Sequence, residues 1–287
     1  MKHVHTIIEK INNLALHPLT RKRIAAAVAF NHLYVILREE NDTVSTYWLE
    51  IFYCFVRSLE GCDDPSITNA LAHIERVMKV KAENLKMPSL HRRKPHEFDD
   101  ATLTYALYWL LSQCGNLDEH CRAKCMELYV NVSQHIDSSA QETTQNFVHT
   151  YGINHLNNII LKGLESGVKD ISMASNMTPL LKALDYYMWL INKELLPVEK
   201  FFPVDIDEQQ IFSHIRSFAC QFWRIIEESS MGTAATTMKS KELEQLQALQ
   251  CKVLMTTLNF IQVLLNVNVS YFDLFYIILL YTYNRDL

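Results

Sequence analysis

Glycine is scarce in this sequence, and its scarcity excludes several fold classes. The 287 residues include 6 glycines, whereas average usage would supply roughly twenty. Sheets joined by tight turns need glycine where the backbone adopts positive φ, so a mainly β protein is excluded. The 7 prolines lie between apolar-periodic segments or at the first position of one, where a missing N–H does no harm. The sequence therefore predicts an all-α fold.

A strong excess of charge of one sign is also missing. The 27 basic and 32 acidic side chains give a formal net charge of −5, so there is no general attraction to DNA or to an anionic membrane. Any nucleic-acid contact must be local. The first ten residues lack the uninterrupted apolar run of a secretory signal. The 7 cysteines are an odd number, mostly at helical core spacing, as is typical of reduced thiols in the cytosol or nucleus.

Apolar residues recur at helical spacing along the whole chain. The clearest stripe ends at Gly61 and consists of Val44, Trp48, Ile51, Phe52, Phe55 and Leu59. Residues that can cap a helix precede this stripe and the others. We expect caps at Thr20, at Asn41 or Asp42, and at Asp64, Asp100, Asp118, Thr144 and Thr178. Further helices are expected to begin near Asp205, Ser240 and Ser270. The pattern predicts about 10–11 helices.

The spacing of the predicted helices indicates stacked helical hairpins. Thr20 and Asp64 begin alternate helices 44 positions apart, within the roughly 40–47 residues of a HEAT-type unit. Longer connections at 86–99, 167–178 and 229–239 would make the repeat irregular. We therefore predict an irregular HEAT-like α-solenoid, with residues 1–287 forming a single helical-repeat segment. The final apolar helix lacks a polar cap, so we expect the chain to be part of a larger protein.

Two blocks of sequence carry a family resemblance. The first is RKRIAAAVAFN at 21–31 with REE at 38–40, and the second is WLLSQCG at 109–115 with EHCRAK at 119–124. In order and separation they resemble the middle helical region of a DNA-repair member of the phosphatidylinositol-3-kinase-like kinase family. The resemblance is best over 20–136 and weaker over 137–200. Residues 201–287 are an unassigned helical continuation.

The resemblance implies a function. Members of this kind are very large nuclear serine/threonine kinases whose HEAT-like cradle holds DNA ends with the Ku heterodimer during non-homologous end joining. Their kinase domain lies far C-terminal to the resembling region, so no catalytic residue can be carried onto this chain. The resemblance thus implies a non-catalytic scaffold segment in the nucleus. Its expected partners are the remainder of the parent kinase chain, Ku and DNA ends.

Two basic groups are the candidate contact residues. The first lies in a proline-bounded loop, KMPSLHRRKPH at 86–96, and comprises Lys86, Arg92, Arg93 and Lys94. Such a loop can meet DNA phosphates or a nuclear import receptor, although solvated loops are often basic without binding anything. The second group is Arg21, Lys22 and Arg23 at a helix start. Positive charges at this position are repelled by the positive end of the helix dipole and do not stabilise the helix, which favours a role in binding a partner.

Three other patterns predict no chemistry. Cys114, Cys121 and Cys125 surround His120, but a four-residue spacing on one helical face is typical of small buried hydrophobes, so we expect no metal and no cofactor. The ending NRDL at 284–287 resembles a kinase catalytic loop. Since a glycine-rich phosphate loop and a DFG are both absent, it is interpreted as a helix end. We expect no catalytic residue.

The apolar stretch from 253 to 283 predicts a buried helical hairpin and no membrane span. Its uninterrupted runs fall short of the ~20 residues a bilayer needs, because polar residues interrupt it at Asn259, Gln262, Asn266, Asn268 and Asp273. Two alternatives to the kinase scaffold remain open here. One is a free-standing helical-repeat adaptor or transport scaffold, and the other is a small α-helical enzyme, which the lack of a convergent acid, base or nucleophile disfavours.

Overall fold

The computed structural model describes residues 2–136, 139–152 and 174–195, and in addition residues 248, 252, 255 and 256. This part of the chain is helical and contains no strand, which confirms the predicted all-α fold. The chain divides into two compact units, residues 1–147 and 148–287, and each is described by itself. The helices expected near Asp205, Ser240 and Ser270 lie outside the described residues, as does nearly all of the stretch 253–283. One continuous array over 1–287 stays a prediction.

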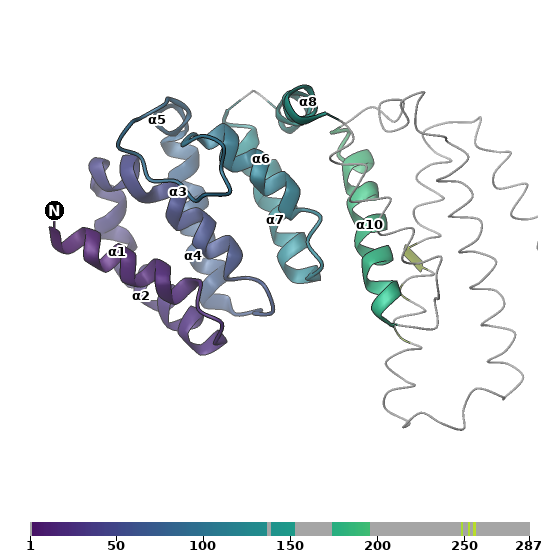
Figure 1. Ribbon diagram of the computed structural model, residues 1–287, viewed down its shortest axis with the longest axis horizontal. Helices are drawn as coiled ribbons and strands as arrows, with labels where there is room; N and C mark the ends of the chain where they lie inside the picture. Colours follow the sequence, from purple (N-terminus) through teal and green to yellow (C-terminus); the bar gives the residue numbers. More distant parts are fainter. Residues whose placement is uncertain are drawn as a thin grey trace, which may run out of the picture. The chain divides into compact units, whose positions relative to one another are not determined.

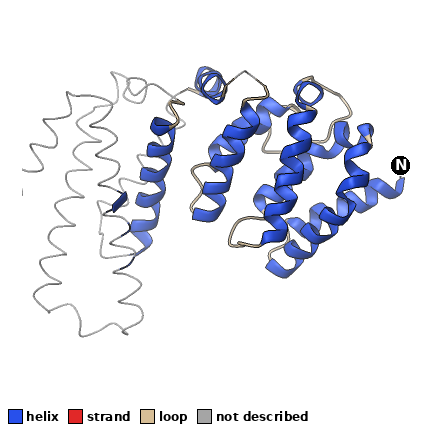
Figure 2. Ribbon diagram, turned by 180° about the vertical axis from the view of Figure 1, so that it is seen from behind, coloured by secondary structure: helices blue, strands red, loops and turns tan. Residues whose placement is uncertain are grey.

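The first unit is an array of helices (Figure 1). Figure 2 shows the same helices from behind, with loops in tan. In order, the helices of this unit are α1 (Lys2–Ala15), α2 (Thr20–Glu39), α3 (Asn41–Arg57), α4 (Pro65–Val80), α5 (Ala82–Lys86), α6 (Leu103–Gln113) and α7 (Glu119–Ser133). Helix α8 (Ala140–Tyr151) crosses the boundary between the units, and α10 (Ala174–Asn192) lies in the second.

The helices of the first unit stack as three hairpins, α1–α2, α3–α4 and α6–α7. Helix α1 packs on α3 and α2 packs on α4, and the third hairpin continues both rows, since α6 meets α3 and α7 meets α4 (Figure 1). The first helices of the hairpins therefore form one layer and the second helices another, which is the arrangement expected of a HEAT-like solenoid. The predicted 44-residue spacing separates the starts of α2 and α4, and these two helices pack side by side. Helix α5 and a long loop separate the second and third hairpins and make the repeat irregular.

Helix α3 forms the core of this unit. All six residues of its predicted stripe are buried, and Leu49, Cys54 and Val56 on its other sides are buried as well. Burial all round follows from its position, because α1, α2, α4 and α6 each pack against it. The ring of Phe30 from α2 lies 5.0 Å from that of Phe55 and 6.0 Å from that of Trp48. Helix α3 thus ties both layers together.

Two of the predicted caps are confirmed. Oδ1 of Asp64 accepts a hydrogen bond of 2.8 Å from the backbone N–H of Ser66, and Pro65 is the first residue of α4. Oδ1 of Asp118 accepts one of 2.8 Å from the N–H of Cys121 in the first turn of α7. Each carboxylate satisfies an N–H that the helix leaves unpaired and places a negative charge at the positive end of the dipole.

Three caps were predicted wrongly at the starts of α2, α3 and α6. Helix α2 already includes Thr20, whose hydroxyl accepts from Arg23 while Leu19 precedes the helix. Helix α3 begins at Asn41, one of the two expected positions, but Glu40 precedes it without a side-chain capping bond, and Asp42 lies within the first turn. Asp100 binds the adjacent N–H of Ala101, and α6 begins after Thr102. The prediction took a polar residue near each helix start to be the cap, but no side chain caps these three helices.

Two further predicted starts lie inside helices. Helix α8 begins at Ala140, where Oγ of Ser139 accepts from the N–H of Glu142, and Thr144 is buried within it. The Thr144 hydroxyl instead bonds the carbonyl of Ala140 and the hydroxyl of Tyr129. Helix α10 begins at Ala174 and contains Pro179, so the Thr178–Pro179 start is also wrong. A threonine inside a helix can bond the carbonyl four residues earlier, as Thr144 does. The sequence alone does not distinguish such a threonine from one that caps a helix.

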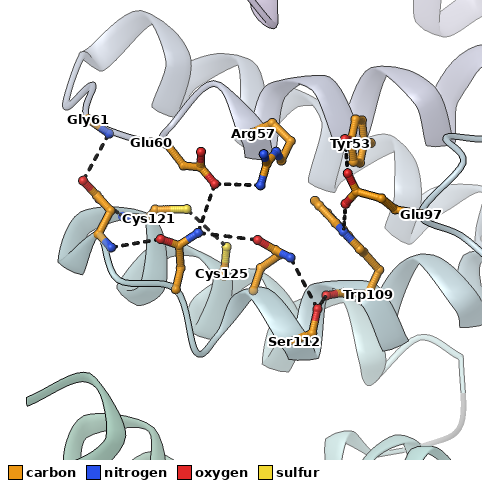
Figure 3. Close-up of polar contacts among 12 residues, drawn as sticks. Tyr53, Arg57, Glu60, Gly61, Glu97, Trp109, Ser112, Cys121 and Cys125 are labelled. Atoms are coloured by element: carbon orange, nitrogen blue, oxygen red, sulfur yellow. Dashed lines mark hydrogen bonds and ion pairs between the residues drawn. The ribbon is translucent and has the colours of Figure 1, made fainter. Parts of the chain in front are cut away.

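Replacing Asp118 tests how the second and third hairpins are joined. Besides capping α7, its Oδ2 accepts a 3.1 Å hydrogen bond from the N–H of Gly61, in the turn after α3 (Figure 3). We expect Asp118→Ala to lower the free energy of unfolding of the full chain by about 1–2 kcal/mol, as for other lost caps. Urea unfolding followed by far-ultraviolet circular dichroism measures this. The matched control is Asp63→Ala, an exposed carboxylate expected to cost under about 0.5 kcal/mol; equal effects of the two would contradict the account.

Candidate partner-contact site

Arg92 is the centre of the basic loop that joins α5 to α6. Its side chain is buried, at 7% exposure. Its guanidinium donates hydrogen bonds of 2.8–2.9 Å to backbone carbonyls of the start of α3, of α5, and of both ends of the loop, namely Ser45, Asn84, Leu85, Met87 and Ala101. Burial lowers the pKa of Arg92 below its usual value, yet an arginine stays charged. Arg92 thus fastens the loop to α3 and to the C-terminal carbonyls of α5.

Arg93 connects the loop to α1 and α3. Its guanidinium lies 3.2 Å from Oε1 of Glu9 and 3.3 Å from Oε2 of Glu50, and it sits over the ring of Tyr47, 5.7 Å from the centroid. His5 completes the cluster by approaching both Tyr47 and Glu9. Burial raises the pKa of the Glu50 carboxyl, while the charge of Arg93 acts in the opposite direction. Arg93 is therefore a bridge between two carboxylates from different helices.

Glu97 anchors the second half of the loop. Its carboxylate accepts hydrogen bonds from the hydroxyl of Tyr53 on α3 and from the indole N–H of Trp109 on α6 (Figure 3). Burial and this hydrogen bond raise the pKa of Tyr53. Phe98 is buried, with its ring 6.0 Å from that of Tyr53 and 5.4 Å from that of Trp109. The loop is thus an ordered cover over α3 and α6.

The two lysines of the basic loop also have partners within the protein. The ammonium group of Lys94 donates to the carbonyls of Phe98 and Asp99, and that of Lys86 donates to the carbonyl of Ile136, 2.9 Å away. Lys94 is nevertheless exposed and Lys86 half-buried. Each ammonium group can contact a partner while it keeps its hydrogen bonds within the protein.

The second basic group lies at the start of α2. Arg23 donates to the carbonyl of Glu60 at 2.6 Å, and Lys22 contacts the ring of His17 at 3.0 Å. Arg21 is exposed. Arg23 reaches Glu60 in the turn after α3, whereas Arg92 reaches Ser45 near the beginning of that helix. Ser45 and the last residue of α3 are roughly 18 Å apart along the helix, so the structure does not bring the two basic groups together.

These contacts show how far each predicted residue is engaged within the protein. The side chain of Arg92 is buried, and its guanidinium is directed at carbonyls of α5 and of the loop. DNA or partner contact by all seven basic residues stays a prediction. Sequence reasoning also missed Glu9, Glu50 and Glu97. Glu97 directly follows the basic run and could have been paired with it, but nothing in the sequence links Glu9 or Glu50 to Arg93.

The cysteines of α6 and α7 are buried among apolar residues. Cys114, Cys121 and Cys125 are buried, with the Cys121 and Cys125 sulfurs 4.0 Å apart. Burial raises the pKa of Cys114, and the bond from Cys121 together with burial raises that of Cys125. Within the described residues, no group of three or more histidine, cysteine, aspartate or glutamate side chains is arranged to hold a metal. None of the helices described here is long and apolar enough to cross a membrane.

Comparison with known proteins decides the family. Residues 2–276 match the family described as DNA-dependent protein kinase catalytic subunit, CC1/2. The chain belongs to this family. The match confirms the resemblance seen in the two sequence blocks, and it falls on a helical region of a kinase. Since the match covers nearly the whole chain, the stacked hairpins form part of this helical region.

Several catalytic subunits of DNA-dependent protein kinases are similar to the chain. The one from Gallus gallus is 36% identical over 135 residues, which cover 43% of this chain and 3% of the relative. Those from Mus musculus and Xenopus laevis are 25% and 24% identical over 91% of this chain and 7% of each relative. The chain therefore spans between 3% and 7% of the length of these relatives.

Arg92 provides the sharpest test of the loop. We expect Arg92→Met to lower the free energy of unfolding of the full chain by about 3 kcal/mol, because several buried carbonyls lose a charged donor. Lys94→Met, which removes an exposed cation from the same loop, is the matched control and should cost under about 1 kcal/mol. Urea unfolding measures both. An Arg92→Met chain as stable as the parent would show that these hydrogen bonds do not hold the loop.

Proposed function

We propose that this chain is a non-catalytic scaffold segment of a DNA-dependent protein kinase catalytic subunit, acting in the nucleus in double-strand break repair by non-homologous end joining. The observation that carries the proposal is the match of residues 2–276 to the CC1/2 region of that kinase. The stacked hairpins support it, because such arrays offer long surfaces to partners. The serine/threonine kinase activity would belong to the remainder of the parent chain.

The segment would work by positioning. Each hairpin contacts only its neighbours, so the array can bend by small rotations that add along its length. Binding of a DNA end or of Ku at one hairpin would then change the placement of surfaces further along. The loop fastened by Arg92 and Glu97 restrains this bending between the second and third hairpins, since it joins α3, α5 and α6.

A chimera tests this function. The corresponding segment of the Mus musculus catalytic subunit, which matches 91% of this chain, is replaced by residues 2–276, and phosphorylation stimulated by DNA ends and Ku is measured. We expect the chimera to retain the stimulation. The matched control carries Trp48→Asp, which places a charge in the core of α3 and should abolish it. A chimera that assembles fully but no longer responds to DNA ends would contradict the proposal.

Local DNA contact is tested separately. Arg21→Ala and Lys94→Ala each remove an exposed cation, and each should reduce the salt slope of DNA binding by the full chain by about 1. Lys79→Ala is the matched control, because Lys79 lies on α4 and pairs with Glu75. Binding to a blunt duplex is titrated at several salt concentrations. Unchanged slopes for both Arg21→Ala and Lys94→Ala would exclude these residues as phosphate contacts.

A further inference from the structure

The solvent side of α2 carries a regular stripe of exposed residues. This α2 stripe consists of Arg21, Ala25, Val28, His32, Val35 and Glu39. Its members recur at intervals of four, three, four, three and four positions, and two of its apolar residues, Val28 and Val35, are 41% and 56% exposed. The exposed side of a helix in a folded domain is normally polar, whereas intervals that alternate between three and four are those of a seam between two helices.

The α2 stripe is symmetric about its own centre. Its outermost members lie nine positions on either side of residue 30, the next pair lies five positions away, and the inner pair two. An antiparallel α2 from a second copy of the chain, related by a two-fold axis at residue 30, would therefore meet the stripe pair by pair. Ala25 would lie opposite Val35 of the second copy, a small residue against a larger one, and Val28 opposite His32. A surface that matches itself in this way is what a two-fold dimer requires.

The charges at the two ends of the α2 stripe suit an antiparallel partner. Arg21 lies in the first turn of α2, at the positive end of the helix dipole, and Glu39 is the last residue, at the negative end. Both charges are therefore unfavourable toward the dipole of their own helix. In the antiparallel pair, Arg21 of each copy would face Glu39 of the other, and the two dipoles would run in opposite directions. The pairing thus compensates both mismatches.

The charges next to the stripe agree with this pairing. Glu39 accepts from Nε of Arg38 at 2.9 Å, but its side chain remains 71% exposed, and a carboxylate can accept further hydrogen bonds. Exposed Glu40 and Asp42 follow, so the end of α2 is acidic beyond the pair of Arg38 and Glu39. The start of the helix, RKR at 21–23, is basic. An antiparallel arrangement brings a basic start to an acidic end twice in each dimer.

We infer that the α2 stripe is the interface of a two-fold dimer, in which a second copy of this chain lays its α2 antiparallel on the first. The apolar middle of the stripe is removed from water, and opposite charges close the seam at both ends. Each copy contributes one helix, so the interface is small and the dimer belongs to the weak, reversible class. The inference goes beyond the proposed scaffold role. Because Arg21 is also expected to contact DNA, dimerisation is measured in the absence of DNA.

Two other occupants fit the α2 stripe less well. A DNA duplex would attract the basic start of the helix, but the acidic end repels its phosphates, and they offer nothing to the apolar middle. A helix of uniformly acidic or basic character would suit one end of the stripe and be repelled by the other. The stripe needs a partner helix that is acidic at one end, apolar in the middle and basic at the other end, and α2 itself has this composition.

Exchange of charges tests the inference. Sedimentation velocity of the full chain over a range of concentrations should show a reversible equilibrium between monomer and dimer. Arg21→Glu and Glu39→Arg each place like charges opposite each other at both ends of the dimer, so each should weaken dimerisation about tenfold. An equimolar mixture of the two variants restores an opposite-charge pair at each end. We expect the mixture to dimerise about as well as the parent chain, although each variant alone does not.

Matched variants complete the test. Lys94→Glu and Glu83→Arg reverse charges at exposed positions outside the α2 stripe and should leave dimerisation unchanged. Val35→Ser should weaken it, whereas Leu90→Ser, at an exposed apolar residue of the loop, should not. Circular dichroism confirms that each variant is folded. A parent chain that stays monomeric at every concentration, a mixture that dimerises no better than either charge variant alone, or equal effects of the stripe variants and the controls would each overturn the inference.

Discussion

The burial of α3 on all sides is the constraint on which the rest of the first unit depends. Trp48, Phe52 and Phe55 are large apolar side chains at almost zero exposure, and residues on the remaining sides of the helix are buried as well. One layer of helices cannot cover such a helix. Helices α1 and α6 therefore flank it in its own layer, while α2 and α4 cover it from the second. The stacked hairpins follow from this requirement.

The loop between α5 and α6 completes the cover over α3. Its conformation is determined by charged groups that bond backbone and buried rings, with Arg92 at one half and Glu97 at the other. This explains why a run of basic residues is not a freely exposed basic patch. Most of its charges stabilise the connection between two hairpins. The charges that remain for partners are fewer, and they lie at separate places on the array.

The sequence predicted those features that depend on residues close together in the chain. The stripe on α3 and the caps Asp64 and Asp118 were predicted correctly, because each depends on contacts within one helical turn or one helix face. The basic loop was located, but the burial of Arg92 depends on carbonyls of α3 and α5 that only the fold brings to it. The Arg93 bridge to Glu9 is likewise a contact across more than eighty positions.

Membership of the CC1/2 family gives this architecture its context. The match falls on a helical region of a kinase, and the outer faces of a helical array are the surfaces that such an array offers to partners. The exposed cations Lys94 and Arg21 lie at separate places in the first unit.

Hydrogen exchange of the full chain, followed by mass spectrometry, tests the central role of α3 most directly. Amides in the most deeply buried elements exchange only when the whole unit opens. The account predicts that the amides of Asn41–Arg57 exchange most slowly among the helices of the first unit, and that residues 92–98 of the loop are also protected. Exchange in α3 as fast as in the short helix Ala82–Lys86 would contradict it.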